Sequence, residues 1–139
     1  MQSIAVQSLV SVRTDPVKGR CVVAACDIAK GTRVLADPIV CVPRHESALT
    51  DQTVLGRYLF EWNDDADLCA VLGLGSLINH GLPENVALAS NYAERTMEFF
   101  ALTDIAAGEE LVYDYGHEQA ELVAYYGIPA QALARPTSG

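Results

Sequence analysis

The sequence has few basic residues. Nine Lys and Arg stand against 18 Asp and Glu among 139 residues, which gives a formal net charge of −9. Only Lys18 and Lys30 are lysines. Direct nucleic-acid binding needs a basic footprint and is therefore not expected. An acidic surface suits a cationic partner such as a lysine-rich or arginine-rich tail, although the same charge also serves solubility alone.

Long apolar runs and paired cysteines are also missing. No run approaches the roughly 18 residues that span a bilayer, and no basic residue precedes the first apolar ones, so we expect neither a membrane partner nor a signal peptide. The cysteines are Cys21, Cys26, Cys41 and Cys69, and none forms a C-x-x-C pair or lies at metal-ligand spacing from a histidine. We expect free buried thiols, no bound metal and a cytoplasmic protein.

The length and composition fit one globular domain. Hydrophobic residues make up 50% of the chain and charged residues 19%, which is ordinary for a folded domain. We expect a single domain over residues 1–139, with its core over about 3–127 and a loose tail at 134–139. The oligomeric state stays open, and a homodimer is one option.

Short alternating segments between glycine-containing turns predict a mostly-β domain. The expected strands are 3–13, 21–25, 34–42 with an interruption at Pro38, a hairpin of 85–92 and 96–103, and 110–115. A polar loop is expected at 43–51 and irregular structure at 68–78. Residues 118–126 are the one well-marked helix, because Gly127 stands where a C-terminal cap belongs.

Two further patterns stand out. Tyr58, Phe60 and Trp62 share one face of an extended segment, and such a stripe either joins the core or forms the wall of a slot for a long aliphatic side chain. Asp27–Gly31, with the sequence D-I-A-K-G, is echoed by Asp104–Gly108, with D-I-A-A-G. The echo predicts that two similar turns join consecutive strands.

The chemistry of this chain is expected where two distant polar segments follow apolar ones. Asn79-His80 ends the longest apolar run, and Tyr113–Gly116 reads Y-D-Y-G at the end of a strand. The sequence has no G-x-S-x-G, and its glycines fit neither phosphate-loop fingerprint. Hydrolytic and phosphate-binding sites are therefore not indicated.

Five segments, in this order, resemble the motifs of one family. They are Gly19–Ala24 followed by Asp27-Ile28 and Gly31, then Tyr58–Trp62, Leu72–Leu77, Asn79-His80 and Gly108–Gly116. The first resembles the motif G-R-G-V-x-A, the pair at 79–80 matches the start of N-H-S-C-x-P-N, and the last matches G-E-E-L-x-Y-D-Y-G. Over about residues 17–117 the chain resembles small solitary SET-domain protein lysine methyltransferases.

The resemblance implies a fold and a reaction. The fold is a β-rich SET (β-clip) fold with a knot-like crossing, in which the C-terminal segment threads beside the Asn79-His80 loop, and with one C-terminal helix. The cofactor is S-adenosylmethionine, and the acceptor is a lysine ε-amine of a basic protein or peptide, with a histone or histone-like protein among the candidates. Such an amine must be neutral to accept a methyl group, and desolvation in an apolar channel favours that form.

The resemblance also implies cofactor contacts. Gly19, Arg20 and Cys21 lie along S-adenosylmethionine, and Asn79 and His80 hold it largely through backbone groups. Tyr126 or its neighbour is placed to cover the adenine by sequence position alone.

Three tyrosines are expected at the other side of the channel. By resemblance Tyr115 lines the channel at the reacting methyl and is the catalytic candidate. Tyr113 and Tyr58 are candidate walls around the substrate lysine, because aromatic rings suit an aliphatic stem with a cationic end.

Departures from the motifs keep one alternative open. Cys21 stands at a motif glycine, Gly81-Leu82 replaces Ser-Cys, and Pro83-Glu84 reverses the usual order before Asn85. The alternative is a SET-like module that binds a basic peptide or the cofactor without turnover. Methyl transfer to a small molecule is less well supported, because the resemblance specifies a peptide groove.

Overall fold

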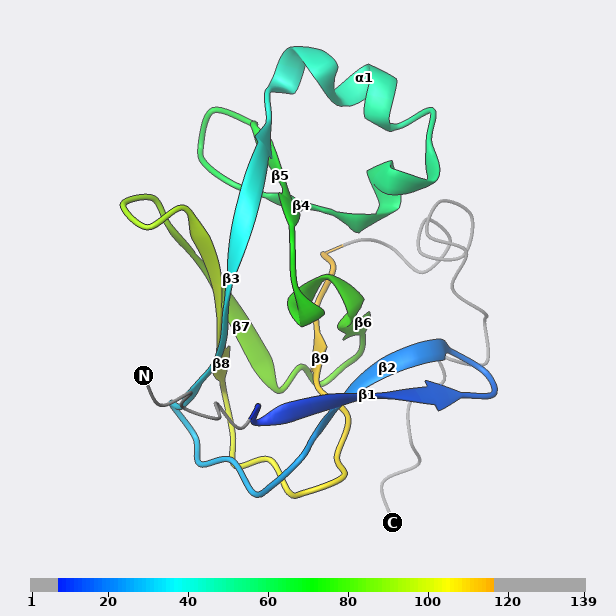
Figure 1. Cartoon of the computed structure of the whole chain (residues 1–139), viewed down its shortest axis with the longest axis vertical. Helices are drawn as coiled ribbons and strands as arrows, with labels where there is room; N and C mark the ends of the chain where they lie inside the picture. Colours follow the sequence, from blue (N-terminus) through cyan, green and yellow to red (C-terminus); the bar gives the residue numbers. More distant parts are fainter. Residues whose placement is uncertain (1–7, 117–139) are drawn as a thin grey trace, which may run out of the picture.

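The computed structural model describes residues 8–116, and the fold in this part of the chain is mostly β (Figure 1). The strands are β1 (Val10–Asp15), β2 (Gly19–Ala24), β3 (Arg33–Val42), β4 (Leu59–Glu61), β5 (Leu68–Val71), β6 (Asn79–His80), β7 (Val86–Asn91), β8 (Thr96–Ala101) and β9 (Val112–Tyr113). The helical segments are η1 (Arg44–Glu46), α1 (Ser47–Thr50), η2 (Val54–Tyr58) and η3 (Leu74–Leu77). The prediction of a mostly-β domain is confirmed.

The strands form one larger sheet and two pairs. The sheet has the order β4-β5-β3-β8-β7, and the pairs are β1-β2 and β6-β9. Figure 1 shows β6 and β9 between the β1-β2 ribbon and the sheet. The segment with η1, α1 and η2 follows β3 and lies beyond its Val42 end (Figure 1). Within residues 8–116, no helix has the length and apolar character to cross a bilayer.

Strand β3 is continuous, and the predicted interruption at Pro38 is wrong. Residues 33–38 pair with β8, whereas residues 39–42 pair with β5. Pro38, which has no N–H to donate, lies where the strand changes partner, and its carbonyl accepts the Leu72 N–H at 2.9 Å. The missing N–H lies at the end of both ladders, so it interrupts neither run of pairs.

The two echoed turns face each other. Ile28 and Ile105 exchange both of their backbone N–H···O hydrogen bonds, each 2.8 Å long. The Asp27 carboxylate accepts the N–H of Ala107, and the Asp104 carboxylate accepts an N–H of the first turn, both at 2.9 Å. The two similar turns therefore stabilise each other, because the aspartate of each accepts a backbone N–H of the other.

The core joins one face of the sheet to buried residues of β1, β2 and the two echoed turns, among them Val10, Val22, Ile28 and Ile105. The hairpin predicted over 85–92 and 96–103 is confirmed as β7 and β8, with Met97 and Phe99 buried as its alternation required. Gly75 is buried against this core, and a Cβ there would overlap the Phe99 ring and the Asp37 carboxylate. Asp37 is itself buried, accepts the Gly75 N–H at 2.8 Å, and has its pKa raised by desolvation.

Several local predictions need correction. Of the strand predicted over 3–13, residues 3–7 lie outside the described residues, and β1 runs on to Asp15. Val12, expected on the same face as Val10, is 41% exposed. Tyr58 ends the 3-10 turn η2, so it does not share the buried face of Phe60 and Trp62. The expected strand at 110–115 is only the two-residue β9. Before it, Glu110 forms an isolated antiparallel bridge with Val23 of β2, and after it the Tyr115 N–H donates to the His80 side chain.

The thiols are also less uniform than expected. All four are free, but only Cys21 and Cys69 are buried, whereas Cys41 is half-buried and Cys26 is exposed in a turn. Burial raises the pKa of Cys69 to about 12. The predicted helix at 118–126, the loose tail and Tyr126 lie outside the described residues.

Candidate active site

The two segments that the sequence analysis singled out lie side by side. β6 pairs in parallel with β9, so Asn79 is opposite Val112 and His80 is opposite Tyr113. The Gly81 N–H continues the ladder to the Tyr113 carbonyl at 3.1 Å. The site is therefore built where β6, at the end of an apolar run, meets β9, the last described strand, as Figure 1 shows.

Asn85 fastens this junction and was not among the predicted site residues. It is 7% exposed, its side-chain amide donates to the Glu110 carbonyl, and its amide oxygen accepts the Val112 N–H, both at 2.8 Å. Its own N–H donates to the Val112 carbonyl at 3.0 Å. Its place at the end of the loop motif was the available signal, since a buried side-chain amide with two backbone partners, together with the bond from its own N–H, fixes the approach to β9.

Tyr115 is held from two sides. Its backbone N–H donates to His80 Nδ1 at 3.0 Å, and its hydroxyl donates to the Ile78 carbonyl at 2.9 Å. Because Nδ1 accepts a hydrogen bond, the neutral His80 ring carries its proton on Nε2. The two rings meet edge to face with centroids 5.2 Å apart. The orientation of Tyr115 thus depends on Ile78, which precedes β6, and on His80, which lies within β6.

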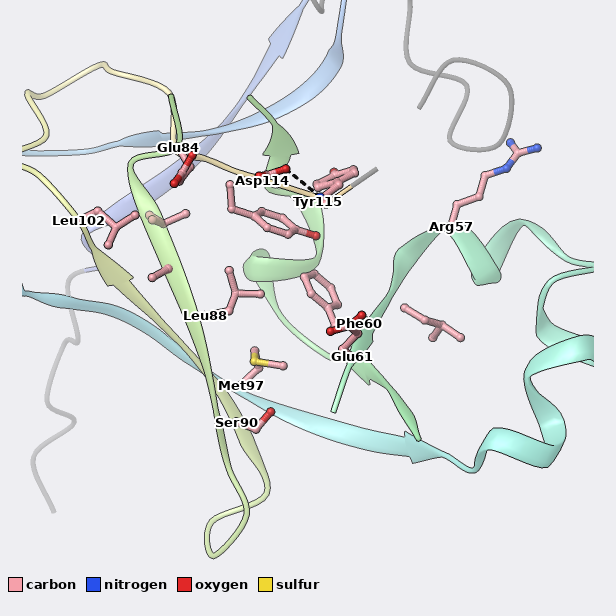
Figure 2. Close-up of a pocket in the computed structure, with 15 residues that line it drawn as sticks. Arg57, Phe60, Glu61, Glu84, Leu88, Ser90, Met97, Leu102, Asp114 and Tyr115 are labelled. Carbon is pink, nitrogen blue, oxygen red and sulfur yellow. Dashed lines mark hydrogen bonds between the residues drawn. The ribbon is translucent and has the colours of Figure 1, made fainter. Parts of the chain in front are cut away.

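An aromatic layer connects Tyr115 to the sheet. The Tyr113 and Tyr115 ring centroids are 4.6 Å apart, and Tyr113 stacks on Phe60 at 5.7 Å with an interplanar angle of 23°. These rings border a cavity of about 540 Å³ (Figure 2). Its apolar lining includes Phe60, Val86, Leu88, Met97, Leu102 and Tyr113.

Carboxylates dominate the charge around this cavity. Glu61, Glu84 and Asp114 line it, with Arg57 as the cation among its lining residues. All three acidic residues are exposed. In Figure 2 Glu84 and Asp114 lie at one end, Glu61 lies beside Phe60, and the Arg57 side chain extends away at the opposite end. The cavity therefore combines an apolar interior with an acidic mouth.

The candidate cofactor residues meet on the other side of β6. The Asn79 side-chain amide donates to the Arg20 carbonyl and to a Glu110 carboxylate oxygen, both at 3.0 Å. Gly19, with φ of +80°, and Arg20 are exposed, and no atom lies within 4 Å of the place a Cβ would take on Gly19. An open backbone at Gly19 next to the hydrogen-bonded Arg20 carbonyl and Asn79 amide leaves room for a polar ligand at this place.

The predicted site residues divide into those that the structure brings together and those that it does not. Tyr113 and Tyr115 line the cavity, whereas Tyr58 is 41% exposed and does not. Phe60 lines the cavity instead, because β4 begins at Leu59, one residue after Tyr58. The Cys21 side chain is 2% exposed in the core, so only its backbone can face a ligand.

Three other predicted cofactor residues, Arg20, Asn79 and His80, lie at or next to β6. His80 is buried and contacts Tyr115, while Arg20 and Asn79 are joined by the hydrogen bond described above. No cluster of three or more His, Cys, Asp or Glu side chains within residues 8–116 is placed to hold a metal ion.

Known proteins share this arrangement. The family model "SET domain" matches residues 19–116. The chain is 30% identical over 112 residues to a Schizosaccharomyces pombe protein named "Histone-lysine N-methyltransferase, H3 lysine-37 specific", covering 80% of this chain and 76% of that protein.

Two solved structures have the same fold. CpSET8 from Cryptosporidium is 29% identical with a TM-score of 0.65, over 81% of this chain and 59% of that one. A Chaetomium thermophilum PRC2 chain, bound to S-adenosylmethionine, is 25% identical with a TM-score of 0.67, over 80% of this chain and 15% of that one. The chain belongs to the SET-domain family of protein-lysine N-methyltransferases, which use S-adenosylmethionine as methyl donor.

Proposed function

We propose that this protein methylates a lysine ε-amine of a basic protein, with a histone or histone-like protein as the candidate substrate. The observation that carries the proposal is the position of Tyr115. It lines the 540 Å³ cavity and is also hydrogen-bonded to Ile78 and His80 beside the candidate cofactor residues. A side chain fixed at this junction is suited to aligning two reactants, which is the main source of rate in such a transfer.

The proposed cofactor residues are Gly19, Arg20, Asn79 and His80. The support is their convergence: exposed backbone at 19–20, a carbonyl held by the Asn79 amide, and the neighbouring strand β6. S-adenosylmethionine supplies a methyl group on a sulfonium sulfur, and a neutral lysine amine accepts it with its lone pair. The protein's own task is to hold and align the groups on either side of Tyr115.

The apolar part of the cavity lining is suited to keeping the substrate amine neutral. Phe60, Leu88 and Met97 offer no charge to an ammonium group, and desolvation disfavours its charged form. The Tyr115 hydroxyl donates its hydrogen to the Ile78 carbonyl, which fixes where the hydroxyl oxygen lies. Such an oxygen stabilises a polarised methyl group through weak C–H···O contacts.

The substrate class follows from charge. Glu61, Glu84 and Asp114 at the cavity, on a chain of net charge −9, favour peptides with basic residues around the target lysine. A relative named for methylation of histone H3 supports a histone-like substrate.

The test is transfer of a labelled methyl group to core histones and to matched lysine peptides with basic or acidic flanks. We expect label on lysine by mass spectrometry, faster transfer to the basic peptide, and a smaller difference at high salt because exposed charges are screened. Equal rates on both peptides would contradict the substrate class. Cofactor binding without transfer to any lysine would favour the module that binds without turnover.

A further inference from the structure

One carboxylate joins three segments around the candidate cofactor residues. Glu110 Oε1 accepts from Lys18 Nζ at 2.7 Å, and Glu110 Oε2 accepts from the Asn79 amide at 3.0 Å. The same Asn79 nitrogen donates its other hydrogen to the Arg20 carbonyl at 3.0 Å. Lys18, Arg20, Asn79 and Glu110 are thus linked although up to 92 positions separate them in the sequence.

The link is shielded and ordered before any ligand binds. The Lys18 and Glu110 side chains are only 25% and 20% exposed, so their attraction is screened less than that of a fully exposed pair. Lys18 also sits in a turn that is fixed locally, since the Asp15 carboxylate accepts the N–H groups of Val17 and Lys18 at 2.8 Å. These two hydrogen bonds hold the pKa of Asp15 below its ordinary value, so the turn stays capped at neutral pH.

We propose that Lys18 and Glu110 are positioning residues for the cofactor site. Glu110 holds the Asn79 side chain in one rotamer, and Asn79 in turn holds the Arg20 carbonyl, so the ion pair orients both groups that are proposed to meet S-adenosylmethionine. The inference rests on the proposed cofactor contacts of Arg20 and Asn79. It assigns a function to Lys18, one of only two lysines in the chain.

Glu110→Gln tests this with little change of shape. A glutamine has one oxygen, so it can accept from Lys18 or from Asn79 but not from both, and its amide group then faces a second donor. We expect cofactor binding to weaken roughly 10- to 100-fold, the scale of losing a hydrogen bond to a charged group. Lys18→Met should act in the same direction, and Lys18→Arg, which keeps the cation, should bind the cofactor nearly as wild type does.

The sheet provides a matched control. Glu98 bridges a cation and an amide in the same way, accepting from Arg33 at 2.9 Å and from the Asn91 amide at 3.0 Å. It lies on β8, where Met97 and Phe99 on either side face the core, so it points away from the cavity. Glu98→Gln should therefore change thermal stability without changing cofactor affinity.

The measurement is cofactor titration by calorimetry beside a melting curve for each protein, followed by kcat and KM for the cofactor. The inference predicts a raised Kd and KM for Glu110→Gln and Lys18→Met, with kcat at saturating cofactor closer to wild type. It is overturned if Glu110→Gln binds as tightly as wild type, or if Glu98→Gln weakens binding equally. Absence of binding by the wild type would overturn the proposed cofactor contacts and this inference with them.

Discussion

The contact between Gly81 and Val112 gives a quantitative test of the β6-β9 junction. A Cβ added at Gly81 would lie 2.6 Å from Val112 Cβ, 2.7 Å from Cγ1 and 2.9 Å from Cγ2. Rotation of the valine side chain does not relieve this overlap, because its Cβ is fixed to the backbone. For Gly81→Ala to reach ordinary carbon–carbon contact, the strands must separate by about 1 Å.

The expected cost of Gly81→Ala is about 1–3 kcal/mol of unfolding free energy, the range found for overpacked sites. Removing the partner atoms should recover part of it. Val112→Ala removes two of the three contacting atoms, and Val112→Gly removes all three. In double-mutant cycles with Gly81→Ala, we expect favourable coupling of about 0.5–3 kcal/mol, larger for Val112→Gly than for Val112→Ala.

Urea unfolding followed by circular dichroism measures each corner of these cycles. Additive effects, or equal coupling for the two Val112 variants, would refute the steric reasoning. A separation of β6 from β9 also lengthens the hydrogen bond between the Tyr115 N–H and His80, so methyl transfer should fall further than stability alone explains. The glycine that departs from the family's serine at this position is thus accounted for by the Val112 side chain, which occupies the space that a Cβ would take.

Three further predictions concern single residues. Burial raises the pKa of Asp37 above 3.8, so its contribution to the free energy of unfolding is present below pH 3.8 and is lost as pH rises through the raised pKa. Asp37→Asn, which can still accept the Gly75 N–H, should flatten the pH dependence of urea stability in this range, and an unchanged slope would contradict this. Asn79→Ala should raise the cofactor Kd in calorimetry, because it releases the Arg20 carbonyl and Glu110, and unchanged affinity would remove Asn79 from the proposed site. Glu84→Gln at the cavity mouth should raise KM for a basic peptide at low salt and less so at high salt, and no change at either would separate the acidic mouth from substrate choice.

The elements that sequence predicted well are those set by local pattern. The hairpin of β7 and β8 followed from strict alternation, and the turns followed from glycine and aspartate. The echo of D-I-A-K-G in D-I-A-A-G predicted two similar turns, but not that Ile28 and Ile105 bond to each other. That pairing depends on how the chain returns across 77 positions, which local propensity does not encode.

The errors share a tertiary origin. Local pattern predicts an interruption at Pro38, and this prediction is wrong because β3 changes its partner strand at that residue. Tyr58 was placed on the wrong face because a 3-10 turn, not a strand, leads into β4. Phe60 then fills the aromatic layer against Tyr113.

The segments that form the site could be predicted from the sequence, but the hydrogen bonds that connect them could not. The paired segments at 79–80 and 113–116 were identified from the motifs, and they do lie side by side. The fastening by Asn85 and the bridge through Glu110 were not, because a buried amide or a carboxylate has no signature until its partners are known.

The central claim, that Tyr115 sits at the reaction centre, is tested most directly by Tyr115→Phe. This change keeps the ring and its contacts with His80 and Tyr113, and it removes the hydroxyl that is bonded to Ile78. The measurement is the single-turnover rate of methyl transfer to a lysine peptide, beside a cofactor titration of wild type and variant. We predict a rate about 10²–10³-fold lower, by analogy with losing one oriented polar group at a reaction centre, with cofactor affinity nearly unchanged. A variant that transfers the methyl group as fast as wild type would contradict the account.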